Sequence, residues 1–290
     1  MIAILGGLGA ALMWATATLT SSRAGRLIGA SSTLAWMMVV GLVLATPLAV
    51  ASGPLPAFTP TLVAWLAGSG VGGVLGLLLA YRGLRLGKVG VVAALTSTEG
   101  AIAAVLAVVA GERITTPVLL MLCVIAGGIA TVAFAAGDAA QPADADVEHD
   151  ERDERRAVMF GVAAALCFGV AIYSTAQVGM VMSPFAATLP VRVVGVFGVF
   201  VPMALAGRLR LTRPAVPMVV LIGVAEVLGY ASYVVGARES IAISAVLASQ
   251  FAAITAVAAF ILFRERLSLT QRSGVITIVL GVAVLTAVRG

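Results

Sequence analysis

Residues 89–110 read VGVVAALTSTEGAIAAVLAVVA, and residues 215–236 read AVPMVVLIGVAEVLGYASYVVG. Each stretch is long enough to cross a lipid bilayer as a helix. Each also carries one carboxylate near its middle, Glu99 in the first and Glu226 in the second. A charged side chain at the centre of a membrane helix costs about 2.5–3.5 kcal/mol to insert. A chain that carries two such groups is therefore expected to hold them in a polar cavity between helices.

The composition of the whole chain agrees with residence in a membrane. It is 61% hydrophobic and 11% charged, with a mean hydropathy of +1.12. The apolar runs are continuous, rich in Ala, Leu and Val, and lack the alternation of barrel strands, so they are expected to be helices. The pattern predicts an all-α integral membrane protein with ten transmembrane helices, at residues 2–20, 32–50, 61–81, 89–110, 116–136, 158–176, 185–206, 215–236, 240–262 and 271–288.

An internal repeat divides the chain into two halves. A shift of 153 residues places Tyr81–Thr115 on Val234–Ser268 without a gap. Because each half holds five spans, an odd number, the second half must enter the membrane in the opposite sense. The sequence thus predicts two inverted five-helix repeats, residues 1–137 and 158–290, joined by a charged, solvated linker at 138–157.

The basic residues are distributed unevenly along this topology. Fourteen of the 18 lie in odd-numbered connections between spans. The positive-inside rule then places those connections in the cytoplasm and both termini outside a multi-pass protein of the cytoplasmic (inner) membrane. A pI near 9.9 is explained by these helix ends, so no nucleic-acid partner is expected.

Few polar or aromatic side chains are predicted near the membrane midplane. Two acids against one arginine leave the cavity acidic on balance, which suits a cationic or zwitterionic solute, or a proton. Either glutamate could bind a cation or carry a coupling proton, the arginine could bind a substrate carboxylate, and the aromatic rings could stack on a solute. The predicted binding residues are Glu99, Glu226, Arg192, Gln250, Tyr230, Tyr233 and Trp14.

Structural roles are the alternative for several of these residues. Arg192 could form an ion pair with one of the glutamates, Gln250 could only bridge helices, and Trp14 could only pack. Glycines at 68, 72 and 76 form a stripe of small residues along one helix face, which predicts close helix packing.

Several classes of function are not supported. The chain has no Gly-x-Ser-x-Gly or His-x-x-x-His pattern and no phosphate-binding loop of the Gly-x-x-x-x-Gly-Lys-Ser/Thr type. Its one histidine, His149, lies in the linker, and both cysteines lie inside predicted spans. We therefore expect no catalytic residues, no metal site and no cofactor, and we predict that the protein is not an enzyme.

The chain resembles the EamA family of the drug/metabolite transporter superfamily. The resemblance rests on the repeat itself, on Gly111–Thr115 (GERIT) before the fifth span, on its second copy Arg264–Ser268 (RERLS), and on Trp14 in the first span. Three features depart from the family pattern. Spans four and nine lack a central proline, residues 51–60 lack a basic cluster, and the charges imply termini outside rather than inside.

The resemblance implies a secondary active transporter that exports small metabolites, such as amino acids and related zwitterionic or cationic solutes. It would work by alternating access between inverted halves, with proton coupling through a membrane glutamate. Two alternatives are a multidrug exporter of lipophilic cations and a non-transporting membrane scaffold or receptor. The expected partners are the bilayer, protons and a small solute, and the expected assembly is a monomer or homodimer.

Overall fold

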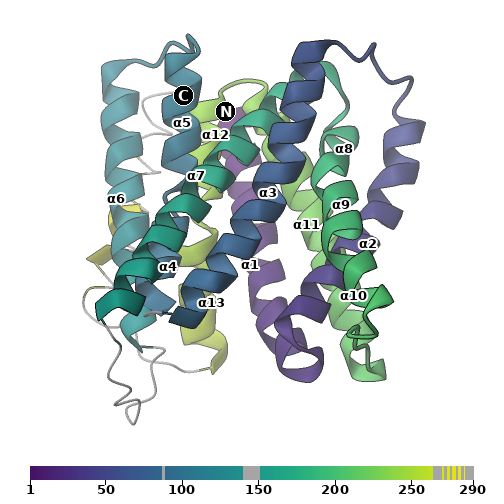
Figure 1. Ribbon diagram of the computed structural model, residues 1–290. Helices are drawn as coiled ribbons and strands as arrows, with labels where there is room; N and C mark the ends of the chain where they lie inside the picture. Colours follow the sequence, from purple (N-terminus) through teal and green to yellow (C-terminus); the bar gives the residue numbers. More distant parts are fainter. Residues whose placement is uncertain are drawn as a thin grey trace.

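The computed structural model describes residues 1–86, 89–139 and 151–263, together with 270, 273, 274, 276–278, 280, 281 and 284. Over these residues the fold is all-helical, as predicted, and the helices pack side by side in one bundle (Figure 1). The tenth predicted span, 271–288, falls mostly outside the described residues. The elements are α1 (Ile2–Ile28), α2 (Ala30–Ala51), α3 (Pro60–Leu86), α4 (Val89–Thr96), α5 (Glu99–Val109), α6 (Thr116–Ala139), α7 (Glu151–Val181), α8 (Pro184–Ala187), α9 (Leu189–Gly195), the π-helix η1 (Val196–Phe200), α10 (Val201–Leu205), the 3-10 helix η2 (Arg213–Ala215), α11 (Val216–Ala237), α12 (Ile241–Ala248) and α13 (Phe251–Phe263).

Six helical segments in the described part of the chain are long and apolar enough to cross a membrane. The outer surface of the bundle also exposes large apolar side chains, including Val50, Phe197 and Leu205. Such a surface suits lipid rather than water. The protein is therefore a multi-pass membrane protein. The six segments are Ile2–Ile28, Ala30–Ala51, Pro60–Leu86, Arg152–Val181, Pro184–Leu205 and Arg213–Ala237.

The predictions of continuous helices at 89–110 and 240–262 are wrong, because each helix breaks near its middle. The first breaks at Ser97 and Thr98, between α4 and α5, and the second at Ser249 and Gln250, between α12 and α13. The N–H of Thr98 bonds the carbonyl three residues back, as does that of Gln250. The hydroxyl groups of Thr98 and Ser249 also bond backbone carbonyls of the preceding turn. Such bonds compete with the helix ladder and accompany both breaks, and the same bonds also occur inside the unbroken α1.

The two breaks lie against each other in the bundle. A Cβ atom on Gly100, one residue into α5, would collide with the hydroxyl of Ser249 and the carbonyl oxygen of Ala245. Glycine is therefore required at position 100 for α5 and α12 to approach this closely. This contact joins a broken helix of the first half to a broken helix of the second.

The most extensive helix contacts also join the two halves, because α3 packs on α7 and α1 packs on α11. The predicted glycine stripe lies in the first of these interfaces. A Cβ on Gly72 would lie 2.9 Å from the carbonyl oxygen of Cys167, and one on Gly68 or Gly76 would meet Ser174 or Phe168. The packing role predicted for the stripe is confirmed.

Two carboxylates hold the start of two helices at one end of the bundle. Glu112, in the α5–α6 connection, accepts hydrogen bonds from the Ser240 hydroxyl and from the N–H groups of Ile241 and Ala242. Glu239 accepts a hydrogen bond of 2.9 Å from the N–H of Ala3. A carboxylate at a helix N-terminus satisfies free N–H groups and complements the helix dipole. The glutamate of the GERIT motif thus anchors α12 of the other half.

Candidate functional site

A cavity of about 200 Å³ lies within the bundle, between helices of both halves. The first half contributes residues from α1 to α5, and the second half contributes residues from α7, α9, α11 and α13. Five of the seven predicted binding residues line this cavity, and Tyr233 and Gln250 do not. The charged and aromatic lining residues are Glu99, Glu226, Arg192, Trp14, Phe168, Tyr230 and Phe251.

Arg192 and Glu226 form an ion pair beside the cavity. An Nη atom of Arg192 lies 3.0 Å from a carboxylate oxygen of Glu226. The arginine side chain is 0% exposed and the glutamate 19%. The second Nη of Arg192 lies 3.7 Å from the sulfur of Met38. A Cβ on Gly41 would lie 2.9 Å from the arginine side chain, so this glycine makes room for it. The sequence left either glutamate as the possible partner of Arg192, and the structure pairs it with Glu226.

Glu99 is in a different position. It is the first residue of α5, which follows the break at Ser97 and Thr98, and only 7% of it is exposed. In the described part of the chain, no cation or hydrogen-bond donor lies within bonding distance of its carboxylate. The helix break therefore aims an unpaired acid at the cavity, where the start of α5 offers a favourable dipole.

Aromatic rings form one wall of the cavity. Trp14 makes edge contacts with Tyr230 and Phe251, at ring-centroid distances of 5.1 and 6.2 Å. The guanidinium carbon of Arg192 lies 5.3 Å from the centroid of Tyr230. The indole nitrogen of Trp14 is buried and has no acceptor among the described residues. Trp14 therefore belongs to a tight aromatic cluster at the edge of the cavity.

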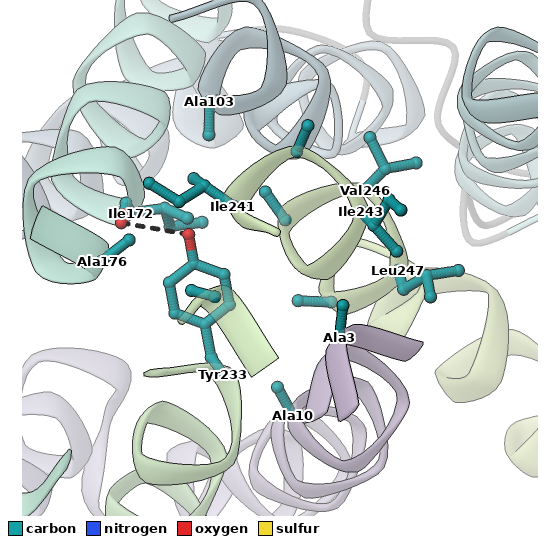
Figure 2. Packing of buried hydrophobic residues seen from close by; sticks show 14 of the residues in the cluster. Ala3, Ala10, Ala103, Ile172, Ala176, Tyr233, Ile241, Ile243, Val246 and Leu247 are labelled. Atoms are coloured by element: carbon teal, nitrogen blue, oxygen red, sulfur yellow. Dashed lines mark hydrogen bonds between the residues drawn. The ribbon is translucent and has the colours of Figure 1, made fainter. Parts of the chain in front are cut away.

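Tyr233 lies one turn beyond Tyr230 on α11 and faces a packed core (Figure 2). Its hydroxyl donates a hydrogen bond of 3.2 Å to the carbonyl oxygen of Ile172, and its side chain is completely buried. Around it, Ala10 of α1 and Ile241 of α12 belong to the same apolar cluster. The helices are thus in direct contact between the cavity and the end of the bundle where Glu112 lies.

Gln250 lies in the break between α12 and α13 and is buried. Its side-chain nitrogen has no hydrogen-bond partner among the residues that the structure describes. The next residue, Phe251, reaches the cavity instead.

Sequence reasoning missed Phe168, Phe251, Met38 and Gly41. One signal for Phe168 was available, since a shift of 154 residues places Trp14 on Phe168. Both rings line the cavity, one from each half. Nothing in the sequence singles out Met38, Gly41 or Phe251, because their roles depend on contacts between helices distant in the chain.

Residues 1–134 match the model of the EamA-like transporter family. This half of the chain belongs to that family, which is part of the drug/metabolite transporter superfamily. A membrane transporter is the function that EamA membership indicates. A solved crystal structure of a protein superposes with a TM-score of 0.75 over 99% of this chain and 97% of that chain, at 15% identity. That likeness shows the fold alone. No curated protein sequence matches the chain.

Proposed function

We propose that this EamA-like protein is a secondary active transporter that moves small metabolites through the central cavity. One observation carries the proposal: a cavity lined by both halves holds an unpaired carboxylate, Glu99, that the helix break directs into it. Intramembrane acids are costly and usually serve a solute or proton pathway. A membrane scaffold would have no need of such a group.

Alternating access requires two halves that can rock about a shared site. Several features support ten spans in two inverted repeats. Under the 153-residue shift the helix breaks of the two halves fall within one residue of each other. The α1–α11 and α3–α7 interfaces exchange places under the repeat, since they join spans one and eight, and spans three and six. The superposition with a solved structure also covers both halves.

The orientation follows from the basic residues. The ends of α1, α3 and α10 and the start of α7 lie at the lower end of the bundle in Figure 1, opposite the start of α12. Arginines follow or occupy these helix ends, and the indole N–H of Trp36 donates to the carbonyl oxygen of Arg210 there. We place this basic end in the cytoplasm.

The direction of access follows from burial around the cavity. On α1, Ala10 is fully buried on the Glu112 side of Trp14, whereas Thr18 lines the cavity on the other side and is exposed. The cavity is then open towards the cytoplasm and closed on the outer side. An exporter would load its solute from this state.

Proton coupling would use Glu99. An acid in a low-dielectric cavity can exchange its proton for a solute when access alternates. Glu226 is less suited to that role because Arg192 already neutralises it. The volume of about 200 Å³ favours a compact metabolite over a drug-sized cation, since pockets for drug-sized ligands usually measure about 300–1,000 Å³.

The test is solute flux into proteoliposomes with an imposed pH gradient, screened over amino acids, amines and neutral metabolites. We expect the gradient to drive flux of at least one solute in the wild type. Glu99→Gln should lower gradient-driven flux at least tenfold. Absence of flux for every solute, in protein shown to be folded, would contradict a transport function. Unchanged driven flux in both Glu99→Gln and Glu226→Gln would show that neither acid couples transport to protons.

A further inference from the structure

We propose that the cavity selects a compact organic cation, a protonated amine or small quaternary ammonium, with Glu99 as its counter-ion, and that it disfavours solutes bearing a carboxylate. The inference rests on the proposed function, because it names the class of solute that the same cavity would carry. Of the cationic and zwitterionic solutes expected from the sequence, the inference retains only the cationic ones.

Among the described residues, one positive charge lines the cavity. A zwitterionic amino acid would need a cation for its carboxylate, and Arg192 is the only cationic side chain lining the cavity over the described residues. Its guanidinium is completely buried, paired with Glu226 at 3.0 Å and packed against Met38 and Tyr230. A solute carboxylate could reach it only by displacing Glu226, which would leave that acid uncompensated. Breaking such a pair by leaving one charge without its partner is strongly unfavourable.

One negative charge of the cavity remains without a partner among the described residues. Arg192 and Glu226 together are neutral, so the net charge offered by the cavity when its acids are ionised is that of Glu99. This carboxylate is nine-tenths buried, lines the cavity and has no partner in the described part of the chain. A buried charge without a partner is costly. A cationic solute in the cavity would supply the missing partner, whereas a carboxylate there would be repelled.

The aromatic wall of the cavity suits an ammonium group as well. Trp14, Tyr230 and Phe251 lie in edge contact and, with Phe168, all line the cavity. The faces of aromatic rings attract ammonium groups, most strongly when water is excluded. The same rings contribute apolar area to a solute of any charge. Together with Glu99 they provide recognition for an ammonium group on a small apolar body.

Matched probes separate charge from shape. Phenethylamine, phenylalanine and 2-phenylethanol share the same ring and chain length and differ in carrying an ammonium, an ammonium with a carboxylate, or no charge. A second set uses isobutylamine, valine and isobutanol. Binding of each is measured by calorimetry on the purified full-length protein in lipid nanodiscs. In the wild type we expect the amine of at least one set to bind at least tenfold more tightly than its amino acid.

Variants test the role of Glu99. Glu99→Gln should weaken amine binding at least tenfold and change binding of the neutral alcohol less than twofold. Glu99→Asp keeps the charge and should keep the preference for the amine over the amino acid. It also serves as the test if the glutamine variant fails to fold. Amino acids binding as tightly as amines, unchanged amine binding in Glu99→Gln, or no binding by any amine would each overturn the inference.

Failure of the inference is distinguishable from failure of the proposed function, because binding is measured without flux. Amine binding with no flux in proteoliposomes would remove the transport function and leave the selectivity. Flux of amino acids without binding of amines would support the transport function and overturn the selectivity.

Discussion

The two halves of the molecule repeat the same backbone device with different chemistry. Each breaks a helix near its middle, and the two breaks touch through Gly100 and Ser249. In the first half the break leads into Glu99, which faces the cavity without a partner. In the second half it leads into Phe251, and the repeat mate of Glu99 is Ala252. The second half instead supplies both members of the Arg192–Glu226 pair.

The two halves therefore share a backbone feature but place different charged residues around the cavity. A symmetric cavity would hold two equivalent acids and suit a symmetric ligand. Here the first half offers an unpaired negative charge and Trp14, and the second half offers a neutral pair and three aromatic rings. A solute with a charged head and an apolar body can bind such a cavity in one orientation.

The largest expected effect comes from breaking the neutral pair of the second half. Arg192→Met leaves the partly exposed Glu226 without its partner, and we expect the free energy of unfolding to fall by about 3 kcal/mol, the low end for a buried pair. Chemical unfolding of the purified protein in detergent measures this change. The double variant Arg192→Met with Glu226→Met removes both charges and should recover most of the loss. Equal stability of the single variant and the wild type would show that the pair is not buried as described.

A smaller effect is expected at the contact between the two breaks. Gly100→Ala forces a Cβ atom against the Ala245 carbonyl and should lower the free energy of unfolding by about 1–3 kcal/mol. The matched control is Gly127→Ala in α6, where an added Cβ meets nothing within 4 Å. The control should be neutral or stabilising by up to about 1 kcal/mol, because alanine favours the helix. Similar unfolding midpoints for the two variants would show that the two breaks are not in close contact.

A substitution in the second break is expected to raise the free energy of unfolding instead of lowering it. Gln250→Met replaces a buried amide nitrogen that has no partner among the described residues with an apolar group of similar size. We expect the free energy of unfolding to rise by about 1 kcal/mol, because an unsatisfied buried donor costs about 1–3 kcal/mol. Gradient-driven flux should stay within twofold of the wild type. A tenfold loss of flux with intact stability would give Gln250 a role in transport and make the breaks functionally alike.

Single cysteine substitutions, which should perturb the protein least, test which side of the cavity is open. In a background with Cys123→Ala and Cys167→Ala, Thr18→Cys should react with a membrane-impermeant thiol reagent in inside-out vesicles. Ala10→Cys should react at least tenfold more slowly, because that position is fully buried. Labelling rates followed by mass spectrometry provide the measurement. Reaction of Thr18→Cys in intact cells alone would reverse the orientation assigned here.

Much of the fold was accessible from hydrophobicity alone. Long apolar runs predict the membrane helices, and the glycines of α3 predict its packing against α7, because only small residues allow such close approach. The breaks at Ser97–Thr98 and Ser249–Gln250 were not predicted. Hydroxyl residues do not single out these positions, because threonines with the same backbone bonds stand inside the unbroken α1.

The candidate site was accessible only in part. Charged residues in apolar runs stand out, so Glu99, Glu226 and Arg192 could be found from the sequence. The choice of Glu226 over Glu99 as the partner of Arg192 depends on how α9 meets α11, which no local pattern encodes. Tyr230 and Tyr233 also looked equivalent, as both lie one or two turns after Glu226. One faces the cavity and the other a packed core.

The caps at the start of α1 and α12 bear on how the chain is built during synthesis. The N–H of Ala3 bonds Glu239, which lies 236 residues later in the chain and is therefore synthesised long after α1. Glu112, by contrast, is in place before α12 emerges and can receive it at once. The N-terminus of α1 therefore gains its cap only after the second half has been synthesised. A nascent chain truncated between the halves would keep its hydrophobic helices but lack the Glu239 cap, so the first turn of α1 would fray and be more open to proteases.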